Sequence, residues 1–176
     1  MKQIKQPVFL CGMMGSGKST IGKQLGVELG ATFKDMDDLI ELKMNMSIPE
    51  IFEKLGEESF REAEKNLLIE ESQRNDGVLA LGGGSLQNQN LVDHVKLQGW
   101  LIFLDTPLTT LVERLRRSQN RPMIDNTTSG LENRLNRLLE ERLPLYSQAH
   151  IKIKTDGLSI KEIVTNIRKQ LANYEQ

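Results

Sequence analysis

The segment at residues 12–20, GMMGSGKST, constrains this chain more than any other part of its sequence. It contains the pattern G-x-x-x-x-G-K-S, with the apolar run PVFLCG before it and a stretch after it that places Ile21, Leu25 and Leu29 on one helical face. Glycines let backbone N–H groups curve around phosphate oxygens, and the N-terminus of the following helix adds a favourable dipole. The pattern predicts a strand–loop–helix unit that binds a nucleoside triphosphate, most simply ATP with magnesium.

The rest of the chain alternates apolar runs with amphipathic stretches. Strands are predicted at PVFLCG, ATFKD, VLAL, WLIFLD and HIKIKT, and capping boxes at 47–50 (SIPE) and 159–162 (SIKE) predict two helix starts. This alternation is typical of an α/β fold with a parallel sheet covered on both faces. Since no linker or repeat interrupts it, we expect one domain over 1–176. Ligands on such sheets bind at the carboxyl ends of the strands.

Composition excludes several classes of protein. The 176 residues are 38% apolar and 27% charged with a net charge of −1, so no basic excess points to nucleic acid. No segment is apolar for long enough to span a bilayer, and the single cysteine, Cys11, fits a buried position in a reducing compartment. We therefore expect a cytoplasmic protein without nucleic-acid or membrane partners. GTPases are disfavoured because the sequence has neither an N-K-x-D nor a D-x-x-G switch motif.

The acid that completes a magnesium site can be sought at the strand ends, and two candidates remain open. Asp105 ends WLIFLD as an ordinary magnesium ligand would, but an acid two residues before Pro107 is also typical of a helix cap. Asp35 and Asp37, in DMDDLIE, are two positions apart, so in an extended strand end both would point toward the crevice. Alternatively, Asp35 and Asp38 only favour the start of a short helix.

Glycines and arginines mark the other candidate positions. Residues 82–84 are three consecutive glycines at the end of a buried strand, which cost roughly 0.5–1 kcal/mol each relative to alanine. Something therefore requires bare backbone there, such as a small ligand; a tight turn is the alternative. Arg61, Arg121 and Arg142 stand apart from ordinary charged helix faces, and a pair of arginines binds a planar carboxylate well. Each could instead be a solvated surface charge.

Taken in order, these motifs resemble the shikimate kinase family. The resemblance covers nearly the whole chain and rests on GMMGSGKST, DMDDLIE, GEESFREAE, LGGGS, NRPMI and RLPLY. It implies a three-layer α/β/α P-loop NTPase fold with a five-stranded parallel sheet and a mobile lid at about 118–130. It also implies transfer of the γ-phosphoryl group of ATP to the 3-hydroxyl of shikimate, on the route to chorismate and the aromatic amino acids. The implied partners are ATP and shikimate, with Mg²⁺ as cofactor and a monomeric protein.

The resemblance further implies a role for individual residues. Lys18, Asp37 and Arg121 would be catalytic, with Asp37 orienting the attacking hydroxyl and Arg121 reaching the phosphates from the lid. Ser19 and Asp35 would serve the magnesium ion, and the loop at 154–159 falls where the family contacts adenine. The residues expected at ATP are Gly12, Gly15, Ser16, Gly17, Lys18, Ser19, Thr20, Arg117 and Arg121. Those expected at shikimate are Asp37, Arg61, Gly83, Gly84 and Arg142, with the two arginines on the carboxylate.

Two other functions remain possible from the motifs. One is another small-molecule kinase on this fold, acting on gluconate or a nucleoside monophosphate. Such an enzyme would not need Asp37, three glycines and paired arginines together. The other is a catalytically silent nucleotide-binding module, against which the presence of Lys18, Asp37 and Arg121 argues.

Overall fold

The computed structural model describes residues 6–117 and 128–174. Five strands form one parallel sheet in the order β2-β3-β1-β4-β5. The strands are β1 (Val8–Cys11), β2 (Phe33–Asp35), β3 (Val78–Ala80), β4 (Trp100–Asp105) and β5 (Ile151–Lys154). The helices are α1 (Lys18–Leu29), α2 (Met36–Met44), α3 (Ile48–Arg74), α4 (Gln89–Gln98), α5 (Leu108–Arg117), α6 (Thr128–Tyr146) and α7 (Ile160–Tyr174). The predicted α/β fold with five parallel strands is confirmed.

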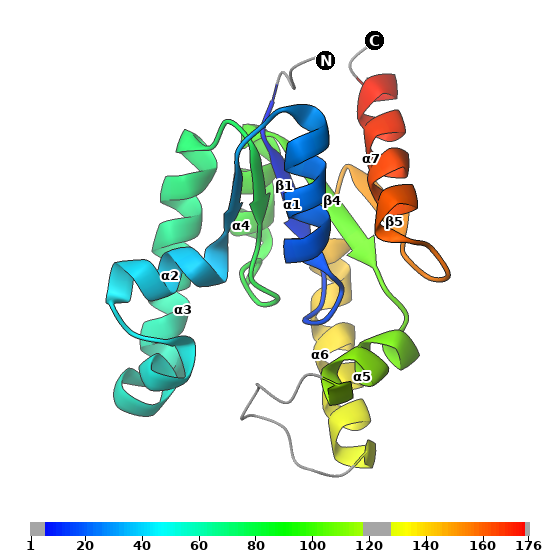
Figure 1. Cartoon of the computed structure of the whole chain (residues 1–176). Coiled ribbons are helices and arrows are strands. Elements are labelled where there is room, and N and C mark those ends of the chain that lie inside the picture. Colours follow the sequence, from blue (N-terminus) through cyan, green and yellow to red (C-terminus); the bar gives the residue numbers. More distant parts are fainter. Residues whose placement is uncertain (1–5, 118–127, 175–176) are drawn as a thin grey trace.

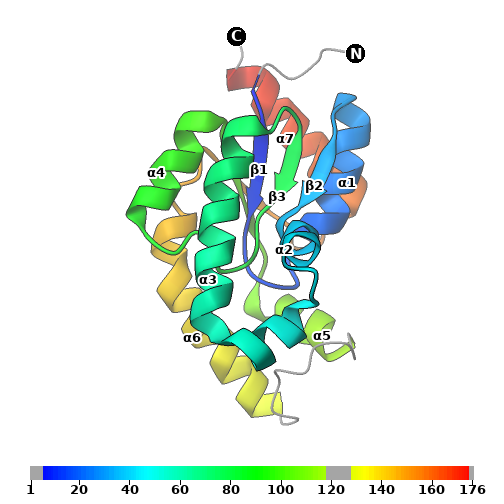
Figure 2. The same cartoon turned by 90° about the vertical axis from the view of Figure 1, so that its left-hand side faces the viewer.

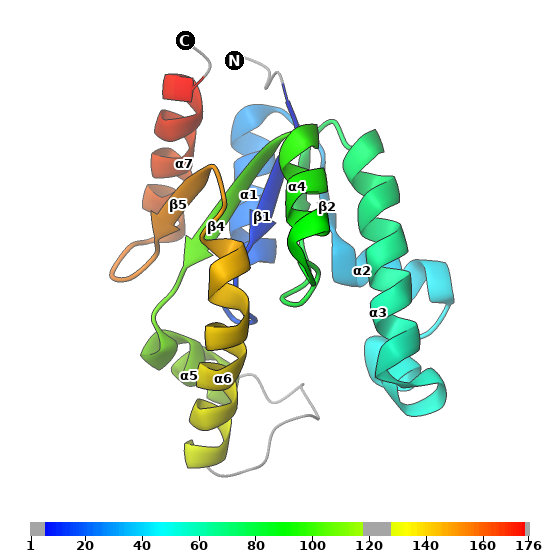
Figure 3. The same cartoon turned by 180° about the vertical axis from the view of Figure 1, so that it is seen from behind.

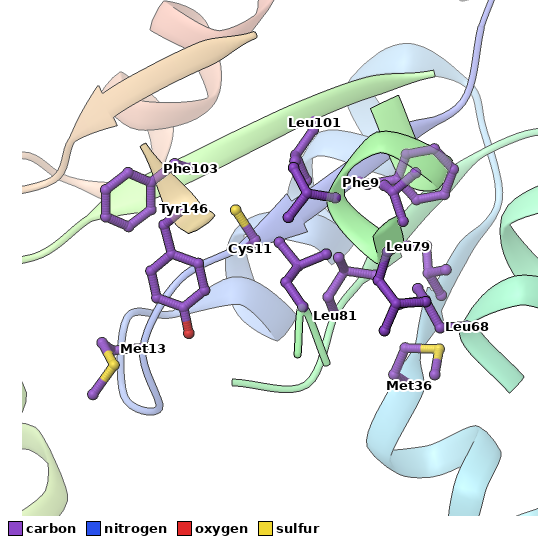
Figure 4. Packing of buried hydrophobic residues seen from close by; sticks show 14 of the residues in the cluster. Phe9, Cys11, Met13, Met36, Leu68, Leu79, Leu81, Leu101, Phe103 and Tyr146 are labelled. Atoms are coloured by element: carbon purple, nitrogen blue, oxygen red, sulfur yellow. The ribbon is translucent and has the colours of Figure 1, made fainter. Parts of the chain in front are cut away.

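Helices cover both faces of the sheet, as Figures 1 and 3 show from opposite sides. Alternate residues of each strand point to opposite faces. In β1, Val8 and Leu10 pack with α1 and α7, whereas Phe9 and Cys11 pack with residues of α3, α4, α5 and α6. Figure 4 shows the second of these clusters from close by. Because β1 is buried on both faces, its whole sequence is apolar, which is why a continuous run predicted it correctly.

Local signals account for most helix ends. Glu50 accepts hydrogen bonds from the N–H and the hydroxyl of Ser47, so the predicted capping box at the start of α3 is confirmed. Gly30 ends α1 in the left-handed conformation, with φ of 63°. Within α3, Gly56 has φ of 83° and interrupts the helical geometry, so the helix that starts at Ile48 is kinked at this residue (Figure 2). The predicted lid reached to about residue 130, but α6 already begins at Thr128.

Burial also determines the chemistry of Cys11. The thiol is 1% exposed, and desolvation raises its pKa to about 12. The reading of Cys11 as a small core residue is therefore confirmed. None of the helices in the described part of the chain combines the length and apolar content that a bilayer crossing needs.

Replacing Gly22 by alanine is expected to destabilise the fold, although alanine is the better helix former by about 0.8–1 kcal/mol. A Cβ atom at Gly22 would lie 2.4 Å from a ring carbon of Phe33, because α1 packs closely on β2. Overpacking of this kind costs about 1–3 kcal/mol, so a net loss of roughly 1 kcal/mol should appear in urea denaturation. Val27→Ala on the same helix is the control; Val27 is 71% exposed, and its change should stay within about 0.5 kcal/mol. A more stable Gly22→Ala protein would contradict the close approach.

Candidate active site

The loop between β1 and α1 has the shape that its glycines predicted. Gly15 and Gly17 have φ of 81° and 90°, a region that side chains other than glycine rarely adopt. Lys18 reaches back across the loop, and its Nζ donates to the carbonyl oxygens of Gly12 at 2.9 Å and Met13 at 3.0 Å. The side chain of Ser16 is buried in the loop, and its Oγ has no hydrogen-bond partner among the described residues. The loop therefore presents an ammonium group and backbone amides at one concave edge.

Ser19 and Asp35 bring two oxygen ligands together at the mouth of this loop. Ser19 Oγ donates to Asp35 Oδ2 at 2.5 Å, and Asp35 Oδ1 accepts the N–H of Asp37 at 3.0 Å. Asp35 is thus the N-cap of α2, which confirms its reading as a helix start, and it is at the same time a neighbour of the P-loop serine. The described residues contain no cluster of three or more acids, histidines or cysteines. This set of a hydroxyl and a carboxylate fits Mg²⁺ that takes its other ligands from phosphate and water.

Asp105, the other candidate for the metal, lies elsewhere. Its carboxylate pairs with Lys152 Nζ of the neighbouring strand at 3.1 Å, and its backbone carbonyl accepts the N–H of Thr155. It does not belong to the residues that line the cavity beside the P-loop. Of the two alternatives, the structure places Asp35 and not Asp105 beside Ser19.

Asp37 reaches the cavity by a route that differs from the expected one. The expectation was that Asp35 and Asp37 share a strand end, and this was wrong, because β2 ends at Asp35 and Asp37 lies in the first turn of α2. Both carboxylates nevertheless line one cavity of about 470 Å³ together with Lys18 and Ser19. The first turn of α2 brings the Asp37 carboxylate close to the glycine run. A Cβ atom at Gly82 would lie 3.3 Å from Asp37 Oδ1.

The two predicted arginines lie against consecutive glycines. A Cβ atom at Gly84 would be 2.6 Å from Arg61 Nη1, and one at Gly83 would be 3.4 Å from Arg142 Nη1. Arg61 comes from α3 and Arg142 from α6, so distant parts of the chain converge here. The protein's own side chains therefore leave no room for larger residues at the glycine run. The sequence had suggested a ligand or a tight turn as the reason for these glycines. Arg142 Nη1 is buried and has no hydrogen-bond partner among the described groups, so it can donate to an anionic ligand.

Glu64 belongs to this cluster and was missed by the sequence analysis. It is 1% exposed, and its carboxylate accepts from Arg61 Nη1 and Ser85 Oγ, each at 2.7 Å. A Cβ atom at Gly82 would lie 2.4 Å from Glu64 Oε1. A signal was present: Glu64 occupies the same helical face as Phe60, Leu67 and Leu68, which are all buried. An acid in an apolar stripe requires partners, because an unpaired buried charge is costly.

The cavity also has an apolar wall and a further arginine. Leu158, Ile160 and Ile163 line it, and Ile160 is 44% exposed. Arg114 also lines the cavity and donates from Nη1 to the carbonyl oxygen of Gly15 at 3.1 Å. Arg117, the arginine that the sequence analysis chose, pairs with Glu113 at 2.6 Å and does not line this cavity. Helix phase explains the difference, because Arg114 is three residues after the buried Leu111 and one before the buried Leu115.

A hydrogen bond between two buried threonines links the loop that leads to this wall with the segment after β4. Thr106 follows β4 and Thr155 follows β5, and their hydroxyls lie 2.8 Å apart. Thr155 also accepts the N–H of Leu158 on its carbonyl oxygen at 3.3 Å. The hydroxyl pair therefore connects the turn that positions Leu158 to the segment that leads into α5. Arg121, predicted to act from the lid, lies outside the described residues, as do Met123 and Ile124.

Comparisons with known proteins agree on one family. The sequence profile of the family described as shikimate kinase matches residues 14–172. A shikimate kinase of Shewanella sp. (strain ANA-3) is 38% identical over 170 residues, which are 95% of this chain and 97% of that protein. The solved structure of shikimate kinase from Acinetobacter baumannii in complex with shikimate is 35% identical, with a TM-score of 0.88 over 96% of this chain and 94% of that one. A gluconokinase from Sinorhizobium meliloti, 16% identical with a TM-score of 0.63 over 98% of this chain and 95% of that one, shares the fold alone.

Arg114→Ala is expected to weaken ATP binding by about five- to tenfold, since it removes a charged donor from the edge of the P-loop. Arg117→Ala, on the same helix, is the matched control and should change the ATP affinity by less than about twofold, because its exposed ion pair contributes little. Calorimetric titration of ATP into each variant measures both. A greater loss for Arg117→Ala than for Arg114→Ala would show that Arg117 is the nucleotide residue, as the sequence analysis proposed.

Proposed function

The chain belongs to the shikimate kinase family, and we propose on this premise that it transfers the γ-phosphoryl group of ATP to the 3-hydroxyl of shikimate. The observation that supports this acceptor is the pair of arginines from different helices that lie against Gly83 and Gly84, directly beside the P-loop cavity. Two guanidinium groups at one small site suit a carboxylate. Asp37 lies on the side of that site that faces the phosphate loop, where a hydroxyl group of the same molecule would be placed.

The described residues divide the work of phosphoryl transfer between binding and orientation. Lys18 would exchange its bonds to the Gly12 and Met13 carbonyls for phosphate oxygens. Ser19 and Asp35 would hold Mg²⁺, which supplies positive charge to the phosphates when bound. Leu158 and Ile160 would contact the adenine, in agreement with the expectation for the loop at 154–159. Arg121 remains a predicted contributor to the phosphate charge.

Asp37 would orient the attacking hydroxyl and accept its proton or a hydrogen bond from it. Its carboxylate is held by the first turn of α2, which is itself capped by Asp35. Asp35, on the phosphate side, and Asp37, on the acceptor side, thus both belong to the first turn of α2 and its cap. The hydrogen bond from the Asp37 N–H to Asp35 Oδ1 keeps the two residues at a fixed separation. The two acids of DMDD are in this way divided between the metal and the acceptor.

A coupled assay of ADP release tests the function directly. The purified protein should turn over ATP in the presence of shikimate and not with gluconate or nucleoside monophosphates. Nucleoside monophosphates have no carboxylate for the two arginines. Gluconate has one, but it is an open chain, so no ring fixes the distance between its carboxylate and the hydroxyl that must lie beside Asp37. Turnover with gluconate would favour the rival kinase reading. ATP binding without turnover on any of these acceptors would favour the silent module.

Asp37→Asn is expected to lower kcat by about 10²–10⁴-fold, the usual contribution of a group that orients or deprotonates a nucleophile. ATP affinity should change by less than about twofold, since the amide has the same shape and the P-loop is intact. Asp38→Asn is the matched control, because Asp38 is the exposed neighbour in the same helical turn. Unchanged turnover in Asp37→Asn would refute the role of Asp37. It would not affect the identity of the substrate, which the assay of ADP release tests separately.

A further inference from the structure

Tyr146 connects the core to the glycine run through its hydroxyl. It is 1% exposed, at the end of α6, and its hydroxyl donates to the carbonyl oxygen of Gly83. The ring packs against Phe103 with centroids 5.2 Å apart, and Figure 4 shows the hydroxyl oxygen directed away from the Phe103 ring. Burial raises the pKa of Tyr146 above its usual range, so the hydroxyl keeps its proton and remains a donor. Packing holds the ring, and the ring places the donor.

The bond restrains the part of the backbone that has the greatest freedom. Gly83 and Gly84 carry no side chains, so their peptide could adopt many orientations without restraint. The peptide bonds of the described residues are all trans, and in a planar trans peptide the C=O and N–H groups point in opposite directions. A bond that holds the Gly83 carbonyl therefore also directs the Gly84 N–H, away from Tyr146. The hydroxyl of Tyr146 sets this direction.

The oriented peptide lies between the two arginines. Gly84 lies against Arg61, with Nη1 2.6 Å from the position of a Cβ atom, and Gly83 lies against Arg142 Nη1. Arg142 precedes Tyr146 by one helical turn, so α6 supplies both a charged group and the group that holds the peptide. Arg142 Nη1 is buried and has no hydrogen-bond partner by distance and angle among the described groups, and the Arg142 side chain also interacts with the Tyr146 hydroxyl. A guanidinium donor therefore lies beside the hydroxyl that holds the peptide.

We propose that Tyr146 is a positioning residue for the anionic acceptor: its hydroxyl orients the Gly83–Gly84 peptide, so that the Gly84 N–H and the two guanidinium groups converge on one carboxylate. This inference rests on the proposed function for the identity of the acceptor. In this proposal the hydroxyl of Tyr146 contributes to acceptor binding, whereas the ring contributes only to packing. The nucleotide side of the cavity takes no part in it.

Tyr146→Phe tests the proposal, since it keeps the ring and removes only the donor. The KM for shikimate should rise by about tenfold, the equivalent of one lost hydrogen bond, while the KM for ATP stays within about twofold. Tyr174→Phe is the matched control. Tyr174 also donates its hydroxyl to a backbone carbonyl, that of His150 at 3.2 Å, but it lies beside Trp100 at the start of β4, away from the P-loop. Neither KM should change in that variant.

A structural role alone predicts a different result. If the hydroxyl only stabilised the fold, Tyr146→Phe would lower the melting temperature and raise both KM values together, or leave both unchanged; either pattern overturns the proposal. Should the variant not fold, the intact protein labelled with ¹⁵N-glycine supplies a second readout. Addition of shikimate alone should shift the Gly84 amide resonance more than that of Gly157, whose loop is on the nucleotide side, and an unmoved Gly84 resonance overturns the proposal. Absence of turnover with shikimate in the unaltered protein, measured first, would instead reject the proposed function.

Discussion

Parallel pairing of β1 with β3 on one side and β4 on the other is the constraint on which the rest of this structure depends. Because all five strands run the same way, every loop that carries a functional group leaves the same edge of the sheet. The P-loop follows β1, the glycine run follows β3, and the two acids lie at the last residue of β2 and just after it. Burial of β1 on both faces holds this edge in place. Because these loops begin directly at the ends of rigid strands, few further interactions are needed to hold their functional groups in place.

The additional restraints are polar, and they differ on the two sides of the cavity. On the acceptor side, the buried Glu64 holds Arg61 and Ser85, and its charge is offset by the guanidinium group. A buried carboxylate is costly unless its oxygens are satisfied, so this network specifies one arrangement of the glycine run. On the nucleotide side, the Thr106–Thr155 pair joins two loops, but the apolar wall around Ile160 remains partly exposed. Buried charge thus restrains the side of the cavity with Arg61 and Glu64, whereas the side with the P-loop combines charged groups with a partly exposed apolar wall.

Much of this could be predicted from local patterns. Strands β1, β3 and β4 were recognised because buried parallel strands are apolar, and β5 because its apolar residues alternate with Lys152 and Lys154 on the wet face. The signal was weak for β2, which contains Lys34 and Asp35 and is only partly buried. The capping boxes at Ser47 and Ser159 were recognised because their hydrogen bonds span three residues. The helices α4 and α6 were not predicted, since neither begins with so clear a signal. The strand geometry assigned to Asp37 was wrong, because the single residue at which β2 ends depends on its pairing with β3.

The sequence by itself determined which chemical groups are available. Residue type and spacing were enough to identify the phosphate loop, whereas the acidic pair, the bare glycines and the two arginines gained their roles from the resemblance to a family. Only the tertiary structure decided which groups meet. Asp35 lies beside Ser19, whereas Asp105 pairs with Lys152 of the adjacent strand. Arg114, Glu64 and Tyr146 join the site because helix phase and packing direct them there. Such contacts link residues up to 99 positions apart, and the free energy of burial that selects them exists only once the sheet and its helices have closed around one core.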